Sequence, residues 1–227
     1  MRKLDYYFDF LSPYSYLAWR NIVEQKEWLK SHEVELQLRP VVLAKLLNHF
    51  EIKGPGEIKP KREYMFRALL RYAQKNNIPF MPPMTHPFNP LYALRLATQA
   101  CSGSSQHDLV DCLWCAGWGG GSERIDLACP DQLQLVLNSM GFEGAHLIEK
   151  SFERAAKLEL KQNCRRAIEL GLFGVPSFVI DDNEIFWGND SIDDLMKYIE
   201  GNDQLDRKLY QECLGNTQRG AGDQSLF

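Results

Sequence analysis

The chain has 227 residues, 44% hydrophobic and 25% charged, a composition typical of a globular protein large enough to bury a full core. A net charge of −4 and a pI near 5.8 argue against nucleic acid or an anionic membrane as the main partner, because both attract basic surfaces. The start of the chain has no signal-peptide pattern and no long apolar run follows, so we expect a cytoplasmic protein without a membrane span.

The first forty residues predict one right-handed βαβ unit. Residues 4–10 are rich in aromatic side chains and favour a strand. Residues 13–30 carry apolar side chains at helical spacing, and residues 34–38 alternate as in a second strand.

The junction between the first strand and the first helix carries Ser12 and Ser15. Ser12 is a favourable N-cap, and Pro13 suits the first helical position, where its missing N–H is not needed. Thioredoxin-fold oxidoreductases have Cys-x-x-Cys at such a corner, where the helix N-terminus stabilises a thiolate. Here both sulfurs are replaced by hydroxyls, which donate hydrogen bonds to a thiolate but form no disulfide. Ser12 is therefore either a helix cap alone or the donor to a thiol that arrives with a cofactor, for which glutathione is the candidate.

The middle of the chain predicts helices joined by short loops. The expected helices are residues 62–73, 90–98, 105–117, 130–140, from 144 onward, and 160–170. The expected loops are residues 53–56, 79–87 and 117–122. The last part predicts a ββα unit with strands at 176–180 and 184–187, a turn at 181–183 and a helix at 191–200 closed by Gly201.

The six cysteines are expected to be free thiols, because the chain is long and lacks a secretion signal. Cys112 and Cys115 form a Cys-x-x-Cys sequence, but inside a predicted helix, away from any helix N-terminus. We expect two buried or half-buried helix cysteines rather than a redox or metal site, and no metal.

Three motifs together carry a family resemblance. They are Ser12-Pro13-Tyr14-Ser15 after an aromatic strand, Gly174-Val175-Pro176 before a late strand, and the five residues 186–190 before the last helix. With them the chain resembles the DsbA-like kappa-class glutathione transferases, and within that group the 2-hydroxychromene-2-carboxylate isomerases. The resemblance implies an α/β, thioredoxin-like fold with a large all-helical insertion, and a homodimer. The glutathione-binding domain would comprise residues 1–44 and 160–205, the helical insertion 45–159, and a polar C-terminal tail 206–227.

The resemblance also implies where glutathione binds. Ser12 would hydrogen-bond the sulfur, with Pro13 and Tyr14 beside it. Val175, preceding a cis Pro176, would pair its backbone with the cysteinyl part in the manner of an added strand.

The γ-glutamyl end would meet Trp187, Gly188, Asn189 and Asp190, although Asp190 is also suited to capping the helix that follows. Lys61 would reach the glycyl carboxylate, with Lys45 and Lys53 as competitors. His86 would either line the pocket of the second substrate or serve the structure of its loop. The chain departs from its relatives at residues 52–54, where they usually carry an asparagine.

The leading expectation is thus a glutathione-dependent isomerase acting on 2-hydroxychromene-2-carboxylate or a similar aromatic-catabolism intermediate by reversible addition of the glutathione thiolate. The alternative is a kappa-class glutathione transferase that conjugates electrophiles. A thiol-disulfide oxidoreductase is disfavoured by the two serines, and a non-catalytic glutathione-binding protein stays open.

Overall fold

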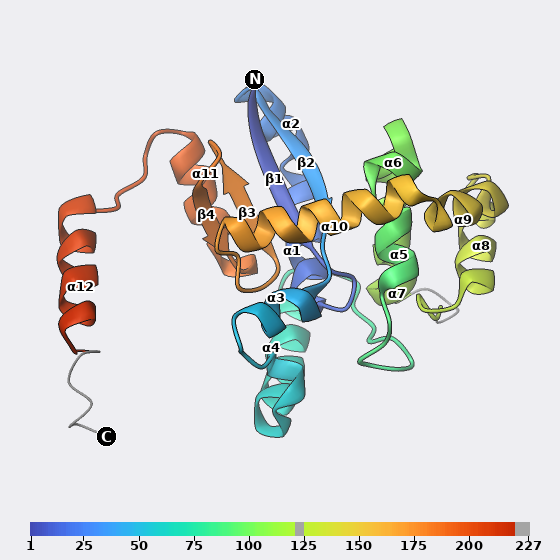
Figure 1. Cartoon of the computed structure of the whole chain (residues 1–227), viewed down its shortest axis with the longest axis horizontal. Coiled ribbons are helices and arrows are strands. Elements are labelled where there is room, and N and C mark those ends of the chain that lie inside the picture. Colours follow the sequence, from blue (N-terminus) through green and yellow to red (C-terminus); the bar gives the residue numbers. More distant parts are fainter. Residues whose placement is uncertain (121–124, 221–227) are drawn as a thin grey trace. The chain divides into compact units, whose positions relative to one another are not determined.

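The computed structural model describes residues 1–120 and 125–220 and divides the chain into two compact units, Met1–Ile192 and Asp193–Phe227 (Figure 1). The predicted loop at residues 117–122 lies partly outside the described residues. So does the end of the predicted C-terminal tail.

The first unit is built on a four-stranded sheet of order β2-β1-β3-β4. The strands are β1 (Arg2–Phe8), β2 (Val34–Pro40), β3 (Ser177–Ile180) and β4 (Glu184–Trp187). β1 runs parallel to β2 and antiparallel to β3, so that Tyr6 lies opposite both Leu38 and Phe178. The predicted βαβ unit and the late β-hairpin are confirmed, and a mixed sheet of this kind is the thioredoxin-like arrangement expected from the sequence.

The helices of the first unit follow the predicted order with shifted ends. They are α1 (Pro13–Glu24), α2 (Lys26–Ser31), α3 (Leu43–His49), α4 (Lys59–Lys75), α5 (Leu91–Leu96), α6 (Gln99–Ser102), α7 (Gln106–Trp118), α8 (Pro130–Ser139), α9 (Gly144–Phe152) and α10 (Arg154–Glu169), with short 3-10 turns η1 (Pro55–Glu57), η2 (Gly103–Ser105) and η3 (Asn189–Ser191). The helix expected over residues 13–30 is broken at Gln25, whose N–H turns back to Ile22. The helix expected from residue 90 begins at Leu91, because the Asn89 side chain accepts from the Leu91 N–H.

One face of the sheet carries an aromatic cluster. Its members are Tyr6, Phe8, Phe10, Tyr16, Trp19, Trp114 and Phe178, with neighbouring ring centroids 4.5 to 6.2 Å apart. Alternation along β1 points Tyr6 and Phe8 to this face, where α1 and α7 cover them. Offset and edge-to-face aromatic pairs add to the free energy gained from burial. The cluster therefore holds the carboxyl end of β1, where the first helix begins, in a rigid setting.

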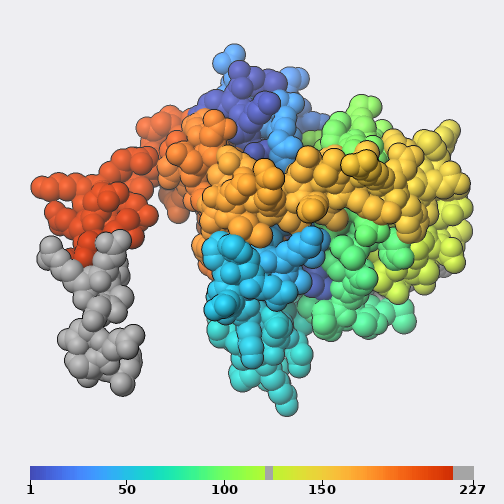
Figure 2. Space-filling view, viewed as in Figure 1, coloured from blue at the N-terminus to red at the C-terminus, as the bar shows by residue number. Residues whose placement is uncertain are grey.

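The opposite face is aliphatic and packs against α10, which crosses the strands in Figure 1. Tyr7 and Val179 of the sheet meet Cys164 and Ala167 of α10, with Val175 in the same buried group. From α3 to α4 the chain, light blue to cyan in Figure 2, forms a lobe that projects below α10. This lobe supplies one wall of the site described next.

The second unit begins at Asp193, the second residue of α11 (Ile192–Ile199), and also contains α12 (Arg207–Gly220). A helix therefore occupies most of the segment for which a polar tail was predicted. The α12 side chains Leu209 and Tyr210 are exposed. In the part of the chain that the structure describes, no helix combines the length and apolar character needed to cross a membrane.

Candidate active site

Ser12 caps α1, as its sequence predicted. Its Oγ accepts from the Ser15 N–H at 3.2 Å, and Pro13 occupies the start of the helix. Ser12 is only 5% exposed. The capping bond uses the oxygen as acceptor and leaves the hydroxyl proton to be donated elsewhere.

The hydroxyl of Ser12 faces the segment before β3. Its Oγ lies 3.4 Å from the Val175 carbonyl oxygen, longer than the usual O–H···O distance of about 2.8 Å. The Val175–Pro176 peptide bond is cis, as the family resemblance implied. Among the described residues the Val175 N–H has no hydrogen-bond partner. A weakly held hydroxyl and an unpaired backbone donor thus lie side by side, although 163 residues separate them in the sequence.

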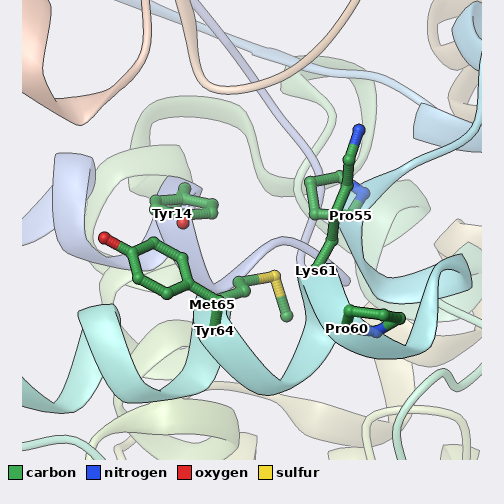
Figure 3. Close-up of a pocket in the computed structure, with 6 residues that line it drawn as sticks. All are labelled: Tyr14, Pro55, Pro60, Lys61, Tyr64 and Met65. Atoms are coloured by element: carbon green, nitrogen blue, oxygen red, sulfur yellow. The ribbon is translucent and has the colours of Figure 1, made fainter.

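A cavity of about 360 Å³ opens next to this corner (Figure 3). Its lining residues are Tyr14, Pro55, Pro60, Lys61, Tyr64 and Met65. Tyr14 and Lys61 were predicted from the sequence, whereas Tyr64 and Met65 were missed. They lie three and four positions after Lys61, so that helical spacing places them on the same face of α4 once Lys61 is assigned to the site.

The segment after β4 joins the same corner through η3. The Gly188 N–H donates to the Pro176 carbonyl at 3.0 Å, and Gly188 has φ 98°, which favours glycine. The Asn189 amide oxygen accepts from Asn21 at 2.6 Å. Asp190 is exposed and, together with burial, raises the pKa of Tyr14. The Tyr14 hydroxyl is therefore protonated, and able to donate, at neutral pH.

Trp187 lies at the end of β4 with half of its side chain exposed. Its ring packs against Phe173 at 4.8 Å, and a Cβ on Gly174 would lie 3.0 Å from its Nε1. The indole therefore covers Gly174, the residue that precedes Val175. Trp187 and Gly188 are thus tied to the segment around Val175 and Pro176, Trp187 by packing and Gly188 by a backbone hydrogen bond.

Of the predicted site residues only Tyr14 and Lys61 line the cavity; Ser12, Val175, Pro176 and residues 187–190 are not part of its lining. The same holds for the two other lysines and His86. Lys45 is exposed on α3, where its charge lowers the pKa of the Cys164 thiol while burial raises it more strongly. Lys53 is exposed in the loop before η1. His86 is partly buried, and its Nε2 lies 3.0 Å from the Leu11 carbonyl oxygen.

Asp9 was not singled out from the sequence, yet it is a fully buried carboxyl three residues before Ser12. It accepts from the Leu11 N–H at 2.9 Å and from the Leu43 N–H at 2.8 Å. Burial raises its pKa to about 7, and these two hydrogen bonds oppose the rise. The signal in the sequence is an aspartate that interrupts the aromatic run Tyr6 to Phe10, on the side of the strand that faces the buried core.

Cys112 and Cys115 lie inside α7, and neither forms a disulfide. Burial raises the pKa of both thiols, that of Cys112 to about 11. A raised pKa disfavours the thiolate, which is the reactive form. In the described ranges, no three histidine, cysteine or acidic residues cluster closely enough to hold a metal ion.

Residues 3–200 match the model of the DSBA-like thioredoxin domain. The chain belongs to this family.

Curated relatives within the family are named for two activities. The chain is 28% identical over 201 residues to a 2-hydroxychromene-2-carboxylate isomerase of Sphingobium xenophagum, covering 87% of this chain and 98% of that protein. It is 27% identical to glutathione S-transferase kappa 2 of Caenorhabditis elegans, covering 80% of this chain and 82% of that protein. A solved 2-hydroxychromene-2-carboxylate isomerase shares the fold with a TM-score of 0.73 at 24% identity, over 95% of this chain and 98% of that one.

Proposed function

We propose that this DSBA-like protein is a glutathione-dependent isomerase that acts on 2-hydroxychromene-2-carboxylate or a similar aromatic-catabolism intermediate. The names of the relatives support the reaction class. The observation that carries the proposal is the corner itself, where a serine hydroxyl replaces the thiol at the start of α1 and lies 3.4 Å from the Val175 backbone. Such a corner lacks its own redox group and suits a thiol supplied by a bound molecule.

The residues around the corner fit glutathione, a tripeptide with one thiol, two carboxylates and one ammonium group. Val175 offers an unpaired N–H to an extended peptide. Lys61 and Asp190 are exposed and form no ion pair within the described residues, so that each is available to an opposite charge. Lys61 would hold a carboxylate and Asp190 the ammonium. Trp187, Gly188 and Asn189 would surround the γ-glutamyl end, with Pro13 and Pro176 shaping the floor near the sulfur.

When bound, glutathione supplies a thiolate that adds reversibly to an electrophilic carbon. The chain's own residues prepare the site for that charge. The Ser12 hydroxyl would donate a hydrogen bond to the sulfur. The partial positive charge of the α1 N-terminus stabilises an anion at the same place. Burial of Ser12 excludes water, which strengthens both effects. Tyr14 and Tyr64 line the cavity and would present hydroxyls to an anionic aromatic substrate there (Figure 3).

The first test is whether the purified protein isomerises 2-hydroxychromene-2-carboxylate, and whether added glutathione accelerates the reaction. Ser12→Ala removes the donor and should lower kcat/KM about tenfold or more, by the free energy of a hydrogen bond to a charged group. Ser139→Ala is a matched control, because it removes a hydroxyl bonded to a backbone carbonyl on α8. Absence of any glutathione effect would refute the proposal.

The second candidate is a kappa-class transferase that conjugates electrophiles, which the similarity to the kappa proteins favours. A transferase consumes glutathione in proportion to product, whereas an isomerase returns it. Measuring free glutathione during turnover therefore separates the two. A homodimer and a cytoplasmic location stay predictions, to be checked by analytical ultracentrifugation and by cell fractionation.

A further inference from the structure

Two aromatic N–H groups hold the loop that precedes Ser12. Trp118 Nε1 donates to the Phe10 carbonyl at 2.8 Å, and His86 Nε2 lies 3.0 Å from the Leu11 carbonyl. The two carbonyls belong to consecutive residues, and the second of them, Leu11, directly precedes Ser12. Both donors come from the helical part of the chain, 75 and 108 residues away in sequence.

The same loop is also held from within the strand. The Leu11 N–H donates to Asp9 Oδ1 at 2.9 Å, and the Ser12 N–H donates to the Asp9 carbonyl at 2.9 Å. Both polar groups of Leu11 are therefore engaged, one by Asp9 and one by His86. The position of Ser12 depends on this set of contacts, because it follows Leu11 directly along the chain.

His86 also packs against two residues that neighbour the cavity lining in sequence. Its ring lies 5.7 Å from that of Phe66, the neighbour of the lining residue Met65. A Cβ on Gly56, the neighbour of Pro55, would lie 3.8 Å from its Cε1. The imidazole thus contacts the Ser12 loop and also residues adjacent in sequence to the cavity lining.

The tautomer of His86 follows from its partner. A carbonyl oxygen only accepts, so Nε2 carries the hydrogen. Nδ1 is buried without a partner, and a proton there would be a buried donor without an acceptor. Burial, together with the charge of Arg62, lowers the pKa of His86, in agreement with a neutral ring.

We propose that His86 is a positioning residue: by donating to the Leu11 carbonyl, it fixes the Ser12 hydroxyl relative to the cavity in which the substrate binds. It acts through Leu11 rather than by contact with substrate. The inference rests on the proposed function where it concerns a bound thiol, but the effect on the loop itself does not.

The experiment compares four variants. His86→Leu removes the donor and keeps an apolar side chain of similar size, whereas His86→Gln keeps an N–H donor with similar reach. Trp118→Phe removes the second donor, to Phe10, and carries the test if His86→Leu does not fold. His107→Leu is the matched control, because His107 Nε2 makes the same kind of contact with the Leu36 carbonyl at 3.2 Å, at the β2 strand.

In His86→Leu, we expect kcat for the isomerisation to fall about tenfold with KM within about twofold of the native value, the loss expected from one hydrogen bond. The pKa of enzyme-bound glutathione, followed by the ultraviolet absorbance of its thiolate, should rise. His86→Gln should recover most of both effects, and His107→Leu should change neither. Unchanged kcat and thiol pKa in His86→Leu would overturn the inference, as would a rise in KM alone, which indicates a substrate contact.

A readout without glutathione separates this inference from the proposed function. Amide resonances of Leu11, Ser12 and Ser15 in ¹H–¹⁵N spectra should shift in His86→Leu and not in His107→Leu. If the native protein does not bind glutathione but these shifts occur, the proposed function fails and the positioning of Ser12 stands. If glutathione binds and the shifts do not occur, the positioning role fails.

Discussion

The buried carboxyl of Asp9 makes the stability of this protein depend on pH. Its pKa is raised from 3.8 to about 7 in the folded chain, so the native state binds this proton more tightly than the unfolded state does. The contribution of Asp9 to the free energy of unfolding is therefore fully present below its pKa in the unfolded state, and it is lost as the pH rises through about 7. Asp9→Asn removes the titration and keeps the shape of the side chain.

The structure sets the size of the effect. A rise of about three pKa units corresponds to about 4 kcal/mol, at about 1.4 kcal/mol per unit. Of this, about 2.5 kcal/mol is lost between about pH 5 and about pH 8. The asparagine keeps one acceptor oxygen, so either the Leu11 or the Leu43 N–H loses its partner, at a cost of about 1–3 kcal/mol at every pH. The variant should be less stable than the native protein at acidic pH, and the difference in unfolding free energy should shrink steadily toward pH 8.

The assay is urea unfolding followed by tryptophan fluorescence at several pH values, with Asp182→Asn as the control at an exposed turn. The quantity of interest is the difference in unfolding free energy between variant and native protein, in which other titrating groups cancel. A difference that stays constant from about pH 5 to about pH 8 would refute the reasoning, since it would mean that Asp9 has similar pKa values in both states.

Three further outcomes are expected. Trp114→Ala opens a void in the aromatic cluster and should cost about 3–5 kcal/mol of unfolding free energy in guanidinium titrations. Arg39→Gln breaks a 2.7 Å ion pair with Asp5 whose side chains are about a third exposed, so the same titration should show a loss below about 1 kcal/mol that shrinks in high salt. Lys61→Met should weaken glutathione binding about tenfold in calorimetry, and Lys53→Met should not; equal effects would exclude Lys61 as the carboxylate contact.

Local pattern accounts for what the sequence predicted well. The alternation and aromatic content of residues 4–10 and 34–38 predict buried strands, and the Ser12–Pro13 pair predicts the start of α1. The predicted helix ends were less accurate. For example, α10 starts at Arg154, six residues before the predicted start at residue 160. The seven-residue α3 was missed, because so short a helix offers little periodicity and no side-chain cap.

Local sequence patterns did not predict the long-range contacts around Ser12; the family resemblance alone brought Ser12 and Val175 together, and nothing indicated the contact of His86 with Leu11. Ser12 with Val175, and His86 with Leu11, are pairs far apart along the chain, brought together only by tertiary packing. Nothing in the residues around His86 indicates that its hydrogen-bond partner is the carbonyl of Leu11, next to Ser12. Tyr64 was missed for a different reason, since its relevance depends on placing Lys61 first.

The cap on α1 has a consequence for the polarity of the corner. The oxygen of Ser12 caps the helix: the Ser15 amide occupies one of its two lone pairs, and its hydrogen is only weakly held by the Val175 carbonyl at 3.4 Å. An alcohol engaged in this way is a weaker proton acceptor than a free one, while its hydrogen stays available for a stronger acceptor. The capping bond at the first turn of α1 thereby favours Ser12 as a hydrogen-bond donor to a negatively charged group, whichever molecule carries that group.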